Sequence, residues 1–329
     1  MRLRYAAVVT FALAALASFA VAQTAPPAAP AAPAAPAAPA ATAAPAPPAS
    51  PVSAIRNKIS AGDLLSAESL AEVWRTQHGA DGPWLVGYSW LARGAQLLGE
   101  PANARLYAAS TLYYCNQRLA AGARLADDGE LEYALGSAIE VKAQLLGPAK
   151  GAAFVREQLV RFADSPKSWR ARLHKRLALL TWTGRPAPEL RAEEQVRGAN
   201  TTLASLRGKP VVVYVYSSTC GDCRASAATL ARVRAKWEAR GVQWVALTRW
   251  YGDEAERARE RTVVDSTWTA TYSGMGDTPV VVSTASMLEY GGSSTPTFVF
   301  VDRAGVVREY TPTRLTEAEF DRAIGAIAR

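Results

Sequence analysis

The pattern of hydrophobic and polar positions divides the chain into a helical part and a part in which strands alternate with helices. From residue 52 to about residue 188, apolar residues recur three and four positions apart, as on the buried face of an amphipathic helix. Turn-forming residues interrupt this pattern at 79–83, 99–101, 127–129 and 147–148. We therefore predict an all-α domain of about six helices, arranged as helical hairpins.

Three apolar faces are expected to hold these helices together. They consist of Leu70, Val73 and Trp74; of Trp84, Tyr88, Leu91, Ala95 and Leu98; and of Trp169, Leu173, Leu177 and Leu180. The pentapeptide Ala-Gln-Leu-Leu-Gly occurs at 95–99 and again at 143–147, each time where a predicted helix ends. This repetition loosely resembles tetratricopeptide-type arrays, although its spacing differs from that motif. The array is either a platform for a partner or client, or a bundle that stabilises the rest of the chain.

The second part of the chain reads as a sheet covered by helices. Residues 211–216 are β-branched or aromatic without interruption, which is typical of a strand buried on both faces. A helix over 221–240 should follow, because Ser226, Leu230, Val233 and Trp237 share one helical face. We also expect a leading hairpin before 211 and strands at 242–248, 280–282, 297–302 and 306–310. Between these strands we expect a polar helix at about 253–262, followed by an insertion-like stretch, and a short helix ending at Gly291. The last helix should begin with a capping box of Thr316 and Glu319.

Cys220 and Cys223 form the only closely spaced cysteine pair in the sequence. The change from strand to helix places Cys220 at a helix N-terminus, where unpaired N–H groups and the helix dipole stabilise a thiolate. Such positions lower a thiol pKa from about 8.5 to between roughly 3.5 and 7.5. Cys223 lies one turn later on the same side, so it can attack a mixed disulfide formed at Cys220. The pair can therefore exchange two electrons with a protein substrate.

Three segments occur in a telling order: residues 202–210 before the core strand, Cys220-Gly-Asp-Cys223 after it, and Thr295-Pro296 followed by a strand and a turn. Together they resemble thioredoxin-fold proteins, in particular periplasmic TlpA/ResA-type thiol:disulfide oxidoreductases, over about residues 192–329. The resemblance implies an α/β thioredoxin-like domain with a central mixed sheet and helices on both faces. It implies that Cys220 is the nucleophile and Cys223 the resolving thiol, and that Gly221 and Asp222 tune the redox potential. It further implies that Thr295 and a cis peptide bond before Pro296 bind the substrate; the alternative is a turn proline with a trans bond.

The sequence also departs from this family at four places. Thr219 precedes the first cysteine where the family usually has Trp, and Gly221-Asp222 lacks the frequent proline. Tyr214 matches the position of a buried proton-accepting Asp, and Ser226 stands where some relatives have Glu. The fold prediction is unaffected, but the family's pKa values and potentials do not transfer.

The N-terminus has the pattern of a secretory signal peptide over residues 1–22. A basic start is followed by an apolar stretch at 6–19 and by the small-residue cleavage pattern Ala20-Val21-Ala22. Residues 23–52 are almost wholly Ala and Pro, which predicts a disordered, extended linker. We therefore divide the rest into a helical domain at 53–188 and a thioredoxin-like domain at 189–329. Cleavage predicts a periplasmic or otherwise extracytoplasmic protein; the alternative is an uncleaved N-terminal anchor.

The net charge of the chain is +8. Outside the signal peptide the excess lies at 53–191, which hold 18 basic and 13 acidic residues, with a basic cluster at 167–176. Export makes nucleic acid an improbable partner. A solvated helix face is the default expectation for the cluster, and docking to anionic lipid or to an acidic protein is the alternative.

No metal or cofactor is expected. A haem-attachment motif needs His directly after the second cysteine, where this chain has Arg224. A structural zinc site needs four ligands, but the sequence has three cysteines and two histidines. Copper-delivering relatives use a downstream His, and no His follows His174. The third cysteine, Cys115, lies in an apolar helical run and is either a buried inert thiol or a partner for an intermolecular disulfide.

The sequence therefore predicts thiol:disulfide exchange on extracytoplasmic proteins that carry cysteines or disulfides. The reductase direction is expected because the Asp222 carboxylate opposes formation of a thiolate at Cys220. A membrane electron donor and a peripheral membrane contact are further candidate partners. Two alternatives remain open. One is a non-enzymatic adaptor or client-binding module. The other is a thiol peroxidase, because Thr219-Cys220 resembles part of a Thr-x-x-Cys signature, although Ser217 stands three residues before Cys220 and the usual upstream Pro is absent.

Overall fold

A computed structural model describes residues 50–329, and residues 49–329 form one compact unit. The predicted signal peptide at 1–22 lies outside the described residues, as does the predicted linker apart from residues 50–52. The first helix begins at Val52, where the predicted linker ends.

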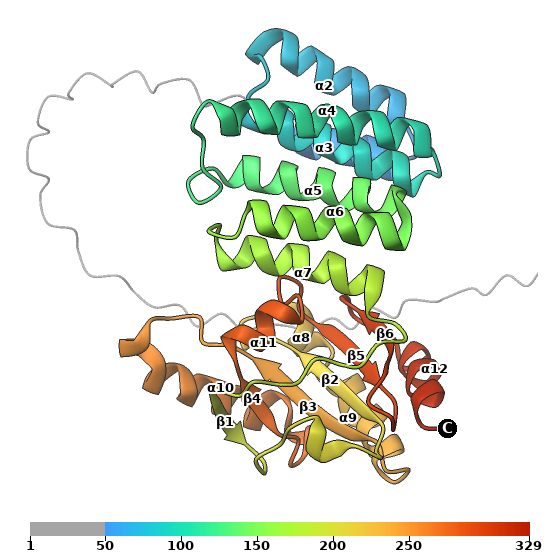
Figure 1. The fold of residues 1–329 in the computed structure, drawn as a ribbon, viewed down its shortest axis with the longest axis vertical. Coiled ribbons are helices and arrows are strands. Elements are labelled where there is room, and N and C mark those ends of the chain that lie inside the picture. Colours follow the sequence, from blue (N-terminus) through green and yellow to red (C-terminus); the bar gives the residue numbers. More distant parts are fainter. Residues whose placement is uncertain (1–49) are drawn as a thin grey trace, which may run out of the picture. The chain divides into compact units, whose positions relative to one another are not determined.

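Seven helices make up the first part of the described chain, one more than the approximate number predicted. Each packs against the next along the sequence, so the helices form a stack (Figure 1). None of the helices in residues 50–329 has the length and apolar character that crossing a membrane requires. Their bounds are α1 Val52–Ser60, α2 Leu64–His78, α3 Gly82–Leu97, α4 Pro101–Ala120, α5 Gly129–Leu145, α6 Gly147–Arg161 and α7 Lys167–Thr181.

The predicted turns fall between these helices, and the residues that signalled them cap the helix starts. Asp81 accepts a hydrogen bond from the Trp84 N–H before α3, and Asp128 accepts one from the Leu131 N–H before α5. These side chains satisfy N–H groups that have no partner within the helix. A proline opens α4 at its first position, where the missing N–H costs nothing.

The predicted apolar face is confirmed in α7, and those of α3 and α2 are confirmed only in part. Trp84, Leu91 and Trp169 are buried. Val73, however, is 56% exposed, and Leu98 lies just after α3 and is 39% exposed, so both assignments are wrong. Among the helices, α2 packs mainly against α1 and α3, and its buried residues are small or lie near its start.

Six strands form one mixed sheet in the order β1-β4-β3-β2-β5-β6. At its centre β2 runs parallel to β3 and antiparallel to β5, so Val213 lies between Val245 and Val299. The predicted leading hairpin is wrong, because β1 pairs with β4 at the far edge of the sheet. The predicted hairpin near the C-terminus is confirmed as β5 and β6. The strands are β1 Glu194–Arg197, β2 Val211–Val215, β3 Gln243–Thr248, β4 Val280–Val282, β5 Thr297–Val301 and β6 Val307–Thr311.

Helices cover both faces of this sheet, as predicted. On one face Tyr214, Phe298 and Phe300 join an aromatic core with residues of α9, α10 and α12. On the other face the valines of β2 and β5 pack with Met287 of α11 and with Ala178 of α7. The helical stack thus contributes to the core of the sheet part through its last helix. The helices are α8 Gly221–Ala225, α9 Ala227–Glu238, α10 Arg257–Thr271, α11 Thr284–Glu289 and α12 Glu317–Ile327.

Two predicted helices have different bounds in the structure. The helix after Cys220 is interrupted at Ser226, whose hydroxyl donates to the carbonyl oxygen of Asp222 (2.8 Å), a contact that bends helices. The polar helix extends to Thr271 through most of the stretch assigned to an insertion. Its second half is held by Val264 and Trp268, which lie one turn apart and are both buried.

Candidate active site

The predicted redox site lies at the junction of β2 with α8. Cys220 is the N-cap residue of α8, as the sequence predicts, and forms a disulfide with Cys223 at a Cα–Cα distance of 5.2 Å. Cys220 is partly exposed, whereas Cys223 is fully buried. An external thiol or disulfide can therefore reach the first sulfur but not the second.

The sulfur of Cys220 is placed where a negative charge would be stabilised. The backbone N–H of Cys223 donates a hydrogen bond to Cys220 Sγ at 3.0 Å, and Cys220 caps the N-terminal end of α8. When the pair is reduced, this donor and the N-terminal end of the helix favour the thiolate over the thiol. The arrangement therefore suits Cys220 to nucleophilic attack on a disulfide.

A second loop faces the same sulfur. The Thr295–Pro296 peptide bond is cis, in agreement with the prediction. The carbonyl oxygen of Thr295 lies 3.3 Å from Cys220 Sγ, and β5 begins directly after Pro296. The backbone carbonyl of Thr295 thus stands beside the Cys220 sulfur, at a place where an extended peptide can pair with the backbone.

This geometry agrees with comparison to known proteins. A family model described as the AhpC/TSA family matches residues 183–310. The match confirms the predicted fold, and it does not extend over α1 to α7. No curated protein matches the chain.

Solved structures also match part of the chain. A thioredoxin-like superfamily protein has 24% sequence identity, with 44% of this chain and 96% of that chain covered and a TM-score of 0.36. A structure described as a putative thiol:disulfide interchange protein DsbE from Chlorobium tepidum has 22% identity, 45% and 98% coverage and a TM-score of 0.36. A thiol-disulfide isomerase from Corynebacterium glutamicum has 21% identity, 44% and 96% coverage and a TM-score of 0.37.

Two phenols lie in the same buried core as Cys223. Tyr214 is buried, and its hydroxyl lies 3.1 Å from the hydroxyl of Tyr272. Burial, and then the neighbouring Tyr272, raises the pKa of Tyr214 well above its ordinary value, so this group stays neutral. Tyr272 was missed from sequence because it lies in the stretch assigned to an insertion. Its position one turn after the buried Trp268 was the available signal.

Asp222 is not alone beside the cysteines. Its carboxylate oxygen lies 3.6 Å from Nη1 of Arg314, and both side chains are more than half exposed. The two charges act on the Cys220 thiolate in opposite directions, so Arg314 offsets part of the effect expected of Asp222. Arg314 lies 92 residues away in sequence, and nothing in the local pattern indicated the contact. Gly221 opens α8 with open space around its Cα.

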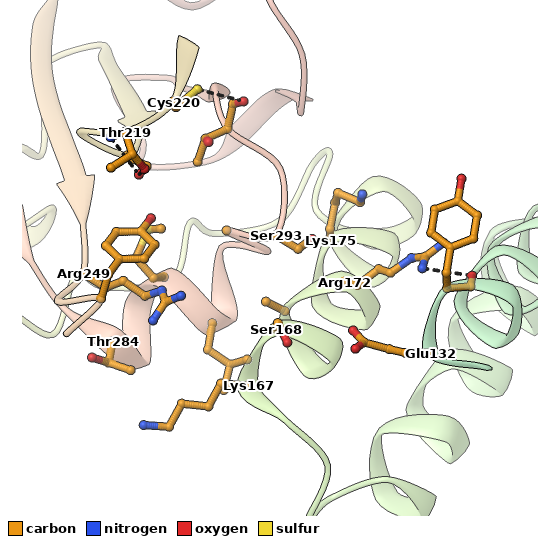
Figure 2. A pocket seen from close by; sticks show the side chains of 18 of the residues that line it. Glu132, Lys167, Ser168, Arg172, Lys175, Thr219, Cys220, Arg249, Thr284 and Ser293 are labelled. Carbon is orange, nitrogen blue, oxygen red and sulfur yellow. Dashed lines mark hydrogen bonds between the residues drawn. The ribbon is translucent and has the colours of Figure 1, made fainter. Parts of the chain in front are cut away.

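A cavity of about 590 Å³ extends from Cys220 towards the helical stack. Figure 2 shows Thr219 and Cys220 at one end, with Arg172 and Glu132 from the helices at the other. Two of its walls belong to the thioredoxin-like domain, namely the loop that carries Arg249 and the segment around Ser293. The helical residues of this cavity were not predicted as site residues.

The basic cluster at 167–176 lies partly in this cavity, and the default expectation of a solvated face is wrong for two of its members. The side chains of Arg172 and Lys175 are only 14% and 17% exposed. Both pair with the buried carboxylate of Glu140, at 3.2 Å from Arg172 Nε and 3.8 Å from Lys175 Nζ. Arg93 completes the cluster at 2.5 Å from Glu140. Burial acts to raise the pKa of Glu140, but these cations outweigh it and lower the pKa to about 2.

Helix α7 is joined to the loop that carries the cis-proline. Lys175 Nζ donates to Ser294 Oγ at 3.0 Å, directly before Thr295. Beyond the end of α7, the ring of Trp182 packs edge-on against Tyr290 and Tyr310, at centroid distances of 5.0 and 5.4 Å. The helical stack is therefore anchored to the thioredoxin-like domain beside its active site.

Cys115 lies far from this site in sequence and has the character of a buried thiol. It is fully buried within α4, and burial raises its pKa to about 12. A thiol with so little thiolate at neutral pH and no access to solvent is inert. The structure confirms this interpretation over the alternative of an intermolecular disulfide.

Proposed function

We propose that this protein exchanges thiols and disulfides with extracytoplasmic proteins through Cys220 and Cys223, acting as a reductase. One observation carries the proposal: an accessible sulfur at a helix N-terminus accepts an N–H bond, is disulfide-bonded to a buried cysteine, and faces the backbone of a cis-proline loop. The match of residues 183–310 to a thioredoxin-like family supports it. The signal-peptide pattern at residues 1–22 supports the extracytoplasmic location.

The proposed reaction consists of two exchange steps. The Cys220 thiolate attacks a client disulfide, forming a mixed disulfide and releasing one client sulfur as a thiolate, which takes up a proton. The Cys223 thiol loses its proton and attacks Cys220 Sγ, which forms the Cys220–Cys223 disulfide and releases the second client thiolate. Two electrons pass from the protein to the client. The state in this structure is the oxidised product of that cycle.

Binding of the client is assigned to the cis-proline loop. An extended client segment would pair with the backbone of Thr295, and Pro296 would fix the direction of that backbone. This pairing places a client sulfur beside Cys220 Sγ, because the Thr295 carbonyl lies 3.3 Å from it. Gly221 and Asp222 then act only on the potential of the pair.

Substitution of each cysteine tests the roles. Cys220→Ser should abolish the reduction of insulin disulfides and trap no client. Cys223→Ser should accumulate mixed disulfides, because it keeps the attacking thiolate and lacks the resolving thiol. Cys115→Ser serves as the control and should retain activity. Equal trapping by the Cys220 and Cys223 variants would refute the assignment.

The reduction potential of the Cys220–Cys223 pair tests the direction of electron transfer. Equilibration with glutathione should give a value below about −230 mV, on the reducing side of the glutaredoxins. A value near −120 mV, typical of strong oxidants, would contradict the reductase assignment while leaving the exchange chemistry intact.

Peroxidase and adaptor functions can each be tested against the exchange reaction. A peroxidase would use the hydroxyls near Cys220, and Ser217 Oγ lies 3.0 Å from Thr219 Oγ1, so one of these two hydroxyls donates to the other and only one keeps a free O–H. Consumption of hydrogen peroxide by the reduced protein, faster than reduction of insulin, would favour that function. Retention of client binding and biological effect in a variant without Cys220 and Cys223 would favour an adaptor.

A further inference from the structure

The cavity beside Cys220 carries more positive charge than nearby carboxylates balance. Of the described residues that line it, five are cationic and only Glu132 is a carboxylate. Glu140, behind the lining, is the second nearby carboxylate and pairs with three of the cations. Five cations against two carboxylates leave a net charge of three positive. We call this cavity the basic pocket; its cations are Arg93, Lys167, Arg172, Lys175 and Arg249.

Two of these cations have no carboxylate partner in the described part of the chain. Within residues 50–329, neither Lys167 nor Arg249 lies within ion-pairing distance of a carboxylate. Arg249 Nη1 donates to the backbone carbonyl oxygen of Trp250 at 3.3 Å, which leaves its other N–H groups to meet a ligand. The Arg249 guanidinium lies over the ring of Tyr251, 4.1 Å from its centroid, which holds it in place. Lys167 is exposed at the start of α7. Figure 2 shows both side chains on the same side of the cavity as Thr284.

The pocket also has the size and polar groups of a binding site. Its volume of about 590 Å³ lies within the range typical of ligand pockets. Hydroxyls of Ser168, Thr284 and Ser293 line it beside the cations and can donate to carboxylate oxygens. A concave wall with one sign of charge concentrates the electric field and attracts ions of the opposite sign.

The position of the pocket indicates which part of a client would enter it. Cys220 lies in its lining and Thr295 forms part of its edge. A peptide that places a sulfur at Cys220 and pairs with Thr295 therefore brings residues next to that sulfur against the cations. We propose that the basic pocket binds an acidic peptide segment, so that clients carry Asp or Glu beside the reacting cysteine. This inference rests on the proposed function and assigns a substrate preference to the same site.

The preference can be measured with three matched peptides. Each carries one cysteine in a mixed disulfide with neutral N-acetylcysteine amide, flanked on both sides by two Glu, two Gln or two Lys. The reduced full-length protein converts each mixed disulfide to two thiols and becomes oxidised at Cys220–Cys223. At low ionic strength the Glu peptide should react about tenfold faster than the Gln peptide and the Lys peptide more slowly still, with differences that shrink as salt is added.

Reversing the charge of two pocket residues tests whether the pocket causes this preference. Lys167→Glu with Arg249→Glu should invert the order, so that the Lys peptide reacts fastest. Lys150→Glu with Arg156→Glu changes the net charge equally on the exposed surface of α6, outside the pocket, and should keep the order. Equal rates for the three peptides, or a control that inverts the order as well, would overturn the inference.

A binding measurement separates this inference from the proposed function. The Cys220→Ser, Cys223→Ser variant cannot react, but it keeps all five cations of the basic pocket. Fluorescently labelled peptides with Ser in place of Cys should bind it more tightly with Glu flanks than with Gln flanks. Tighter binding of the Glu peptide supports the pocket even if the wild-type protein reduces no disulfide. Equal binding of the two peptides refutes the pocket even if the exchange reaction is confirmed.

Discussion

The backbone of Lys175 occupies the space that a side chain on Gly291 would need. A Cβ built on Gly291 would lie 2.4 Å from the Cα of Lys175, and the glycine also has a φ of +65°. This contact brings α7 within van der Waals distance of the segment that leads to Thr295 and Pro296. The position of the helical stack is thereby tied to the loop that faces Cys220.

We therefore predict that Gly291→Ala weakens both stability and activity. The positive φ alone should cost about 1 kcal/mol, and the clash with α7 adds to it. Gly241→Ala is the matched control, because that glycine has a φ of +81° with no atom near its Cβ position. Urea unfolding and peptide-disulfide reduction should show a larger loss for the Gly291 variant. Equal losses in the two variants would show that only the backbone angle matters.

Trp182 is expected to couple the helical stack to the thioredoxin-like domain. Trp182→Ala should lower the unfolding free energy by about 2 kcal/mol, since it removes edge-on packing against Tyr290 and Tyr310. Leu179→Ala, at an exposed position of α7, should change the unfolding free energy by less than about 0.5 kcal/mol. Denaturant unfolding, monitored by far-ultraviolet circular dichroism rather than by tryptophan fluorescence, measures both variants. A negligible effect of Trp182→Ala would mean that the two parts are energetically independent.

Glu140 should stabilise the folded chain in a pH-dependent manner. Its pKa falls from 4.5 to about 2 on folding, which corresponds to about 3 kcal/mol of stabilisation. For a carboxylate with a depressed folded pKa, this stabilisation is fully present above pH 4.5 and is lost as the pH falls towards 2. Glu140→Gln should therefore be less stable than wild type by about 3 kcal/mol at pH 7, because it leaves three cations without their carboxylate.

The pH dependence of stability in Glu140→Gln tests whether the charge of Glu140 is the cause. The difference between wild type and Glu140→Gln should shrink as the pH falls from 5 to 3, because the Glu140 carboxyl takes up a proton in the unfolded chain, at its ordinary pKa of 4.5, before it does so in the folded protein. Urea unfolding at several pH values in this window measures it. Glu157→Gln, at an exposed position of α6, is the control and should show no such convergence. A difference that is constant with pH would show that the charge of Glu140 is not responsible.

Asp222 and Arg314 should shift the thiolate of Cys220 in opposite directions. Asp222→Asn should lower the pKa of the Cys220 thiol and Arg314→Gln should raise it, each by roughly a few tenths of a unit because both groups are exposed. The double variant should lie close to wild type. Ultraviolet absorbance of the thiolate in the reduced protein measures all four. A pKa that rises in Asp222→Asn would remove the electrostatic argument for the reductase direction.

Much of the active site was predictable because it depends on residues that are close in sequence. An unbroken run of β-branched and aromatic residues from 211 to 216 and the helical spacing of Leu230, Val233 and Trp237 place Cys220 at the start of a helix. The capping box of Thr316 and Glu319 is present in the structure for the same reason. The cis bond before Pro296 followed from the family resemblance rather than from local pattern.

Other features were not predictable because they join residues far apart in sequence. Glu140 pairs with Arg93 and Arg172, which lie 47 and 32 residues away, and the basic run at 167–176 gave no sign of a buried partner. The position of β1 beside β4 at the far edge of the sheet depends on pairing over more than 80 residues, so local turn signals misassigned it.

Sequence was enough to predict the chemistry proposed for this protein, since a Cys-x-x-Cys pair at a strand-to-helix junction would acquire its reactivity from neighbouring N–H groups. The surroundings of that pair depend instead on tertiary contacts. The packing of α7 against Gly291 and the anchoring of Trp182 bring the cations of the helical stack to one side of Cys220. Periodicity shows which face of a helix is buried, but the partner of that face depends on the shape and charge of distant residues.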